Sequence, residues 1–69
     1  MGRVRYRVVV SGELGPRYAH AFEGMKLRVR DGTSEITGIV DHAQLRSVLN
    51  RVDDLGLTLL SVRTSSGPG

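Results

Sequence analysis

Hydrophobic and polar residues alternate along the first segment of the chain and again near its middle. From Val4 to Val10 every second residue is apolar, and Arg5 and Arg7 stand between them. A period of two with β-branched residues is typical of a strand with one buried face. Segment 25–30 alternates in the same way. The sequence therefore predicts a strand over each stretch.

Asp31-Gly32 separates the second of these strands from a third, which begins near Ser34. Asp-Gly favours the two-residue turn of a β-hairpin, because both turn positions take a positive φ. A turn of this kind places Arg28 opposite Glu35, and we expect an exposed ion pair between their side chains.

The segment after the third strand has the signals of an α-helix at both ends. Asp41 and Gln44 form a capping box, and Gly56 supplies the left-handed residue that commonly ends a helix. Apolar residues recur between them at helical spacing: Leu45, Val48, Leu49, Val52 and Leu55. The sequence predicts a helix with one apolar face, and Leu57 is expected to contact Val52 beyond its end.

Two further segments complete the pattern. Pro16 suits the first turn of a short helix over Arg17–Glu23. Leu57–Thr64 is predicted as a fourth strand, and its adjacent Leu59 and Leu60 favour a central position or an interface. An alternative leaves the segment after Pro16 as a loop and keeps the same sheet.

The order β-α-β-β-α-β predicts an α+β fold. Short connections and right-handed crossovers favour the ferredoxin-like arrangement, a four-stranded antiparallel sheet of order 4-1-3-2 with both helices on one face. We expect one domain over residues 1–64 and a flexible C-terminal tail over residues 65–69, where serine, glycine and proline predominate.

Two stretches carry a resemblance to known proteins. Ile36 to Leu45 and Asp54 to Val62 together contain the pattern T-G-I-V-D-x-A-x-L…L-G-L-x-L-L-x-V. This pattern resembles a group of short, uncharacterised bacterial proteins of βαββαβ pattern over nearly the whole chain. The resemblance implies the same fold and a stand-alone protein. It brings no activity with it, because the matched positions are mostly helix caps and core residues.

The chain is short, with 69 residues, no cysteine and a formal net charge of +3. A domain of this size buries only about 60% of the surface of its unfolded chain, and disulfides are excluded as a means of stabilising it. We therefore expect a homodimer. No apolar segment approaches the roughly 20 residues of a membrane span, and no export signal is visible, so we expect a cytoplasmic protein without membrane contact.

Most of the basic residues are predicted to lie on the face of the sheet that the helices leave open. This candidate basic face contains Arg3, Arg5, Arg7, Lys26, Arg28, Arg30 and Arg63, against Glu35 as its only acidic residue. Such a surface can follow a phosphate backbone or contact an acidic protein. It also serves solubility alone, which is the commoner role of exposed charge.

Four apolar residues are expected to interrupt that face as a self-association patch: Val9, Ile39, Leu57 and Leu59. The first functional hypothesis is a small non-catalytic interaction or regulatory module, a homodimer that binds a protein partner or a small ligand. The alternative is a nucleic-acid-binding protein that uses the basic face.

Catalytic, metal-binding and cofactor-binding patterns are not found in the sequence. His20 and His42 have no ligand spacing, and no serine has a histidine and a carboxylate beside it in a recognisable pattern. The loop from Val10 to Arg17 resembles the phosphate-binding loop of acylphosphatases, which leaves a phosphate-handling enzyme as a third hypothesis. Glu13 would stand in the anion site of such a loop and Pro16 removes an amide donor, so we expect no enzyme and no cofactor.

Overall fold

The protein is described here by a computed structural model that covers residues 2–22 and 24–64. Its elements follow one another as four strands and two helical segments: β1 (Val4–Ser11), η1 (Pro16–Phe22), β2 (Lys26–Arg30), β3 (Thr33–Val40), α1 (His42–Asp54) and β4 (Leu59–Thr64). The α+β class is therefore confirmed. The expected tail, 65–69, lies outside the described residues.

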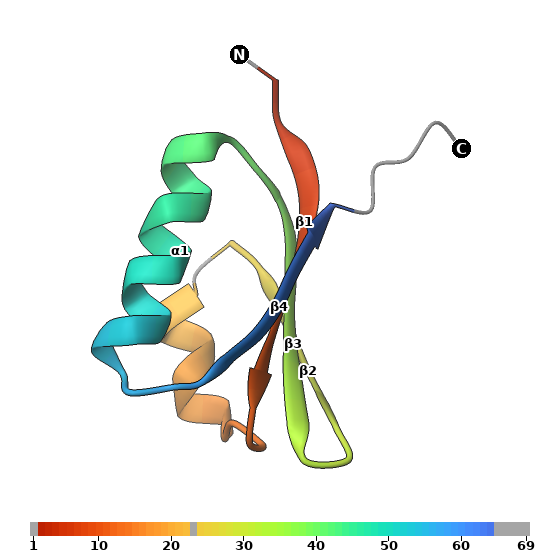
Figure 1. The fold of residues 1–69 in the computed structure, drawn as a ribbon, viewed down its shortest axis with the longest axis vertical. Coiled ribbons are helices and arrows are strands. Elements are labelled where there is room, and N and C mark those ends of the chain that lie inside the picture. The colour runs from red at the N-terminus through yellow and green to blue at the C-terminus, as the bar shows by residue number, and fades with distance from the viewer. Residues whose placement is uncertain (1, 23, 65–69) are drawn as a thin grey trace.

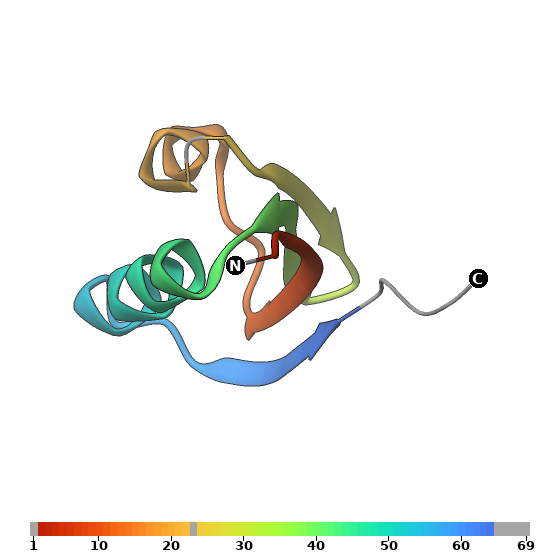
Figure 2. The same cartoon turned by 90° about the horizontal axis from the view of Figure 1, so that it is seen from above.

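The four strands form one antiparallel sheet of order β2-β3-β1-β4, which is 4-1-3-2 when read from the opposite edge. Both helical segments lie on the same side of this sheet, and the other face is left open (Figures 1 and 2). The strands β2 and β4 are the two edges.

The first helical segment differs from the expected α-helix. Pro16–Phe22 is a 3-10 helix of seven residues, and Glu23, the last residue of the predicted helix, lies outside the described residues. The N–H of Tyr18 donates to the carbonyl of Gly15 over 3.0 Å, which is the i to i+3 spacing of this tighter winding. A segment this short, between Gly15 and Gly24, can form few α-helical hydrogen bonds to offset the unfavourable free energy of helix nucleation.

The predicted hairpin is confirmed in its turn and in its register. Asp31 and Gly32 both have positive φ, 26° and 83°, and Arg28 lies opposite Glu35. The expected Arg28–Glu35 ion pair is wrong, however. The carboxylate of Glu35 lies 3.7 Å from Arg7 and 3.6 Å from Arg30, its diagonal neighbours on β1 and β2.

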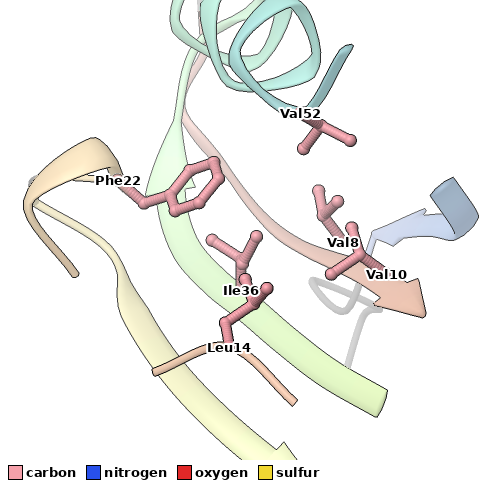
Figure 3. Close-up of a cluster of buried hydrophobic side chains, with 6 residues drawn as sticks. All are labelled: Val8, Val10, Leu14, Phe22, Ile36 and Val52. Carbon is pink, nitrogen blue, oxygen red and sulfur yellow. The ribbon is translucent and has the colours of Figure 1, made fainter. Parts of the chain in front are cut away.

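The core lies between the sheet and the helical segments, as Figure 3 shows. Each element except the two edge strands contributes a buried side chain to it, and the loop before η1 contributes one more: Val8, Val10, Leu14, Phe22, Ile36 and Val52. Phe22 reaches this cluster from η1 and Val52 reaches it from α1, which holds both segments against the sheet.

Both ends of α1 are built as predicted. The Asp41 carboxylate accepts the N–H of Gln44 over 2.8 Å, and the Gln44 side chain accepts the N–H of Asp41 over 3.2 Å. Gly56 has φ 72°, and the N–H of Leu57 donates to the carbonyl of Val52 over 3.0 Å. The capping box and the glycine C-terminus are therefore confirmed.

The last strand is shorter than predicted, because Leu57 belongs to the glycine cap that follows α1. Leu57 packs against the core cluster, and β4 begins only at Leu59. A register shift opposite Val9 and Val10 leaves Leu60 as an extra residue between the partners of these two valines. A central position for this strand is wrong, since β4 pairs with β1 and lies at the edge of the sheet.

Candidate nucleic-acid interface

Alternation along the strands decides which side chains reach the open face. Tyr6, Val8 and Val10 are buried beneath the helical segments, so Arg5 and Arg7, which alternate with them, project from the other face. The same argument applies to the neighbouring strands through their register. It places Lys26, Arg28 and Arg30 of β2 and Arg63 of β4 on the open face as well.

The register aligns four polar residues in one row across the whole sheet. Arg63 lies opposite Arg7, Arg7 lies opposite Thr37, and Thr37 lies opposite Lys26. With neighbouring strands about 4.8 Å apart, this row is about 14 Å wide at the backbone. Three cations and one hydroxyl therefore follow a single line perpendicular to the strands.

A hollow of about 630 Å³ lies beside this row on the open face. Its polar lining comes from three strands: Arg5, Arg7, Lys26, Arg28, Glu35 and Thr37. Four cationic side chains around one carboxylate and one hydroxyl make a site for an anion. A group with several oxygen atoms, such as phosphate, can accept hydrogen bonds from two or more of these side chains at once.

Glu35 divides the cations of the open face into two groups. Its side chain is only 15% exposed and forms both ion pairs of this face, to Arg7 and Arg30. Within residues 2–22 and 24–64, no ion pair is formed by the other members of the basic face: Arg5, Lys26, Arg28 and Arg63. These four side chains are therefore available to contact a ligand.

Arg3 is not part of this surface, contrary to prediction. Its guanidinium donates to the carbonyl of Ile39 over 3.0 Å. It also lines a second hollow, of about 490 Å³, together with His20 of η1 and Arg51 of α1. Arg3 precedes β1, where the sheet no longer fixes the direction of its side chain, and the long side chain turns toward the helical side.

The predicted self-association patch is not brought together. Ile39 lies on the open face and is 48% exposed, and Val9 lies on the same face and is half-buried. Leu57 packs against the core on the other side. Leu59 lies opposite the buried Val10, so it too belongs to the helical side. The placement of Leu57 and Leu59 is wrong because Leu57 belongs to the cap that follows α1, not to the strand, and because β4 contains a bulge.

The glycine-rich loop after β1 is engaged in internal hydrogen bonds. The Glu13 carboxylate accepts the N–H of Gly32 over 2.9 Å, and the hydroxyl of Ser34, which is fully buried, accepts the N–H of Leu14 over 2.9 Å. The Ser34 hydroxyl also donates to the carbonyl of Gly12 over 2.8 Å. A phosphate-binding loop needs amides that point at a ligand, whereas the loop amides of Gly12 and Leu14 donate to Gly32 and Ser34 and hold the loop against the β2–β3 hairpin.

The part of the chain that the structure describes contains no group of three His, Cys, Asp or Glu side chains that could hold a metal ion. His20 lines the hollow between η1 and α1, whereas His42 is the exposed first residue of α1. No helix among the described residues is long and apolar enough to span a bilayer.

Sequence reasoning did not identify Thr37 as part of the interface or Glu35 as the residue that holds two arginines. Both follow from combining the hairpin register with the pairing of β1 and β3. The hairpin register is visible in the sequence. The β1–β3 register joins segments that are far apart in the chain and has no turn to fix it.

Comparison with known proteins gives one relationship. No curated protein and no solved structure matches the chain. A family model matches residues 5–63, a span that runs from β1 into β4 and includes the interface and the core. The chain belongs to the family described as Domain of unknown function (DUF8691).

Proposed function

We propose that this protein is a small, non-catalytic binding module of ferredoxin-like pattern whose open sheet face binds the phosphate backbone of a nucleic acid. The observation that carries the proposal is the cross-sheet row of Arg63, Arg7, Thr37 and Lys26 beside the hollow on that face. The element order and sheet order support the ferredoxin-like description, with the first helix reduced to a 3-10 segment.

The charges of the face favour a polyanion over a single small anion. Four cations without an ion pair in the described chain extend over three strands, from Arg63 on β4 to Lys26 and Arg28 on β2. A nucleic acid presents phosphates at regular intervals, and each neutralised phosphate releases bound counterions. This entropy gain accumulates with the number of contacts, which suits a row better than a pocket.

The side chains between the cations favour duplex over single-stranded nucleic acid. Proteins that bind single strands on a sheet stack the bases on aromatic side chains. Tyr6 is buried on the helical side and Phe22 is part of the core, and the open-face positions of the four strands hold no aromatic residue. Contact through phosphates alone carries no sequence preference.

The experiment measures fluorescence anisotropy of a labelled DNA duplex, and of one of its strands alone, at increasing salt concentration. The test variant replaces Arg5 and Lys26 by glutamine, because both line the hollow and neither is paired with Glu35. We expect duplex binding about 10- to 100-fold weaker at 50 mM salt and a salt slope smaller by about 2.

The matched control replaces Arg17 and Arg46 by glutamine. These two arginines belong to η1 and α1 and are exposed, so the change in net charge is the same on the other side of the molecule. Binding should fall at most a few-fold. An equal loss in both variants would show that net charge rather than this face attracts the duplex, and no binding by the unmodified protein at 50 mM salt would refute the proposal.

A further inference from the structure

The two edges of the sheet differ in their protection against pairing with another strand. An edge strand presents unpaired backbone N–H and C=O groups, and proteins commonly protect it with charged side chains. The edge strand β2 contains three cations in five residues, Lys26, Arg28 and Arg30. The edge strand β4 contains one cation, Arg63, in six residues.

The strand β4 also exposes aliphatic side chains. Leu60 is 52% exposed, Leu59 is 45% exposed and Val62 is 36% exposed. Val8 and Val10, which lie opposite Val62 and Leu59 in the register, are fully buried. A strand with a single charge, an unpaired edge and three exposed aliphatic residues has the properties of a surface to which another strand is added.

We propose that this partner strand is β4 of a second copy of the chain, paired antiparallel about a twofold axis at Val62. An axis perpendicular to the sheet keeps corresponding faces together, so each residue must lie opposite a residue of its own face. Only an axis that passes through a residue position satisfies this condition, because side chains alternate with a period of two. Val62 is the exposed aliphatic residue nearest the middle of the regular part of β4.

This register is compatible with the charges and the shapes of the side chains. Val62 meets its own copy on the helical side, and Leu60 lies opposite Thr64. On the open face Arg63 lies opposite Ser61, so the two arginines do not face each other. Pairing through β2 would instead gather the three cations of each copy on one surface. The charge distribution therefore selects β4 for self-association.

The twofold arrangement also explains why a second copy suits this edge better than a different partner. An acidic protein would be attracted to the five cations of β1 and β2 on the open face, not to a strand with one charge. A head-to-tail pairing of β4 with β2 would leave a free β4 at one end of every assembly and a free β2 at the other, and would continue as a fibre, whereas the twofold pairing uses β4 of both copies and closes. It joins two four-stranded sheets into one and leaves the open face, and thus the proposed nucleic-acid function, intact.

The absence of cysteine from the sequence makes disulfide cross-linking a direct test. In Val62→Cys the two new thiols lie directly opposite each other, with Cα atoms about 5 Å apart, within the range that a disulfide spans. We expect nearly complete covalent dimer under mild oxidation. In Arg63→Cys the Cα atoms lie about 8 Å apart, beyond that range, and cross-linking should be at least tenfold slower.

The matched control is Val29→Cys on the other edge. Val29 is also a valine of an edge strand, it is 42% exposed, and it lies on the helical side opposite Ser34. It should cross-link at the slow rate of random collision. Equal rates for Val62→Cys and Val29→Cys would overturn the proposal, and so would a faster rate for Val29→Cys.

Sedimentation of the unmodified protein and of Leu60→Lys completes the test without cross-linking. Leu60 is the extra residue of the bulge and is half exposed, so lysine there is compatible with the fold. We expect a dimer for the unmodified protein, a monomer for Leu60→Lys with an unchanged circular dichroism spectrum, and a dimer for Val29→Lys. A monomeric unmodified protein at several hundred micromolar, or a dimeric Leu60→Lys, would refute the β4 interface while leaving nucleic-acid binding untouched.

Discussion

The two crossovers of this fold are stabilised in different ways. The connection β3–α1–β4 contains a helix of 13 residues with a capping box at one end and a glycine cap at the other. The connection β1–η1–β2 contains a 3-10 helix of seven residues. Its preceding loop is held by the buried hydroxyl of Ser34 and by the bond between Glu13 and Gly32.

The difference lies in the sequence separation of the groups that make each bond. The side-chain bonds that cap α1 join residues three positions apart. The bonds that hold the first loop join residues 19 to 22 positions apart. The second crossover can therefore form its ends locally, whereas the first depends on the hairpin being in place. Three substitutions test this contrast, beginning with the largest effect.

Phe22→Ala is expected to have the largest effect, because Phe22 is the side chain that anchors η1 in the core and is only 2% exposed. Removing a buried phenylalanine side chain costs roughly 3 to 5 kcal/mol. A domain of this length has a total stability of roughly 3 to 10 kcal/mol. We expect this variant to be at least partly unfolded at 25 °C, as measured by urea denaturation.

Phe22→Leu is the companion variant, since it retains much of the volume and should cost about half as much. If Phe22→Ala lowers the free energy of unfolding by less than about 1 kcal/mol, η1 contributes little to the core. The first crossover would then be a surface loop that does not pack on the sheet, and only the crossover through α1 would contribute to the core.

Ser34→Ala removes the hydroxyl that holds the first loop to β3. The N–H of Leu14 loses its partner in a buried place, and the carbonyl of Gly12 loses its partner in a partly buried one. Leaving such groups unsatisfied costs about 1 to 3 kcal/mol. Chemical denaturation should report this loss, and hydrogen exchange at Leu14 should become faster while exchange within α1 follows only the change in global stability.

Ser47→Ala is the matched control, because the Ser47 hydroxyl donates to the carbonyl of Ala43 within α1 and is exposed. Alanine is the better helix former, so the free energy of unfolding should stay within about 0.5 kcal/mol of the unmodified protein. Equal losses for the two serine variants would show that the separation of the bonded groups along the chain is not what matters.

The same contrast explains which parts of the fold could be predicted from the sequence. Asp41, Gln44 and Gly56 specify the limits of α1 by residue type and spacing, and Asp31-Gly32 specifies the hairpin register; all are found in the structure. The role of Ser34 could not be predicted. A serine in a strand carries no sign of bonding to a loop some 20 residues earlier.

The residues of the candidate interface also differ in whether the sequence could place them. Arg5, Arg7 and Lys26 could be placed on the open face, since alternation within a strand decides the face of each residue. Leu57 and Leu59 could not be placed correctly. The bulge in β4 depends on its pairing with β1, and one extra residue reverses the face of every position beyond it.

Asp41→Ala has the smallest expected effect, and it tests whether the two crossovers are held independently. The carboxylate caps the N–H of Gln44 at an exposed helix end, and loss of such a cap costs about 1 kcal/mol. Asparagine accepts the same bond without the charge, so Asp41→Asn should retain most of the stability and separate the cap from the attraction to the helix dipole. Hydrogen exchange should become faster in the first turn of α1, while exchange at Leu14 follows only the change in global stability.

If exchange at Leu14 in Asp41→Ala becomes faster than the change in global stability accounts for, the loop bonded to Ser34 and the helix capped by Asp41 open together. This outcome would contradict the hypothesis that the crossover through α1 is held by bonds between neighbouring residues independently of the bonds that hold the first loop.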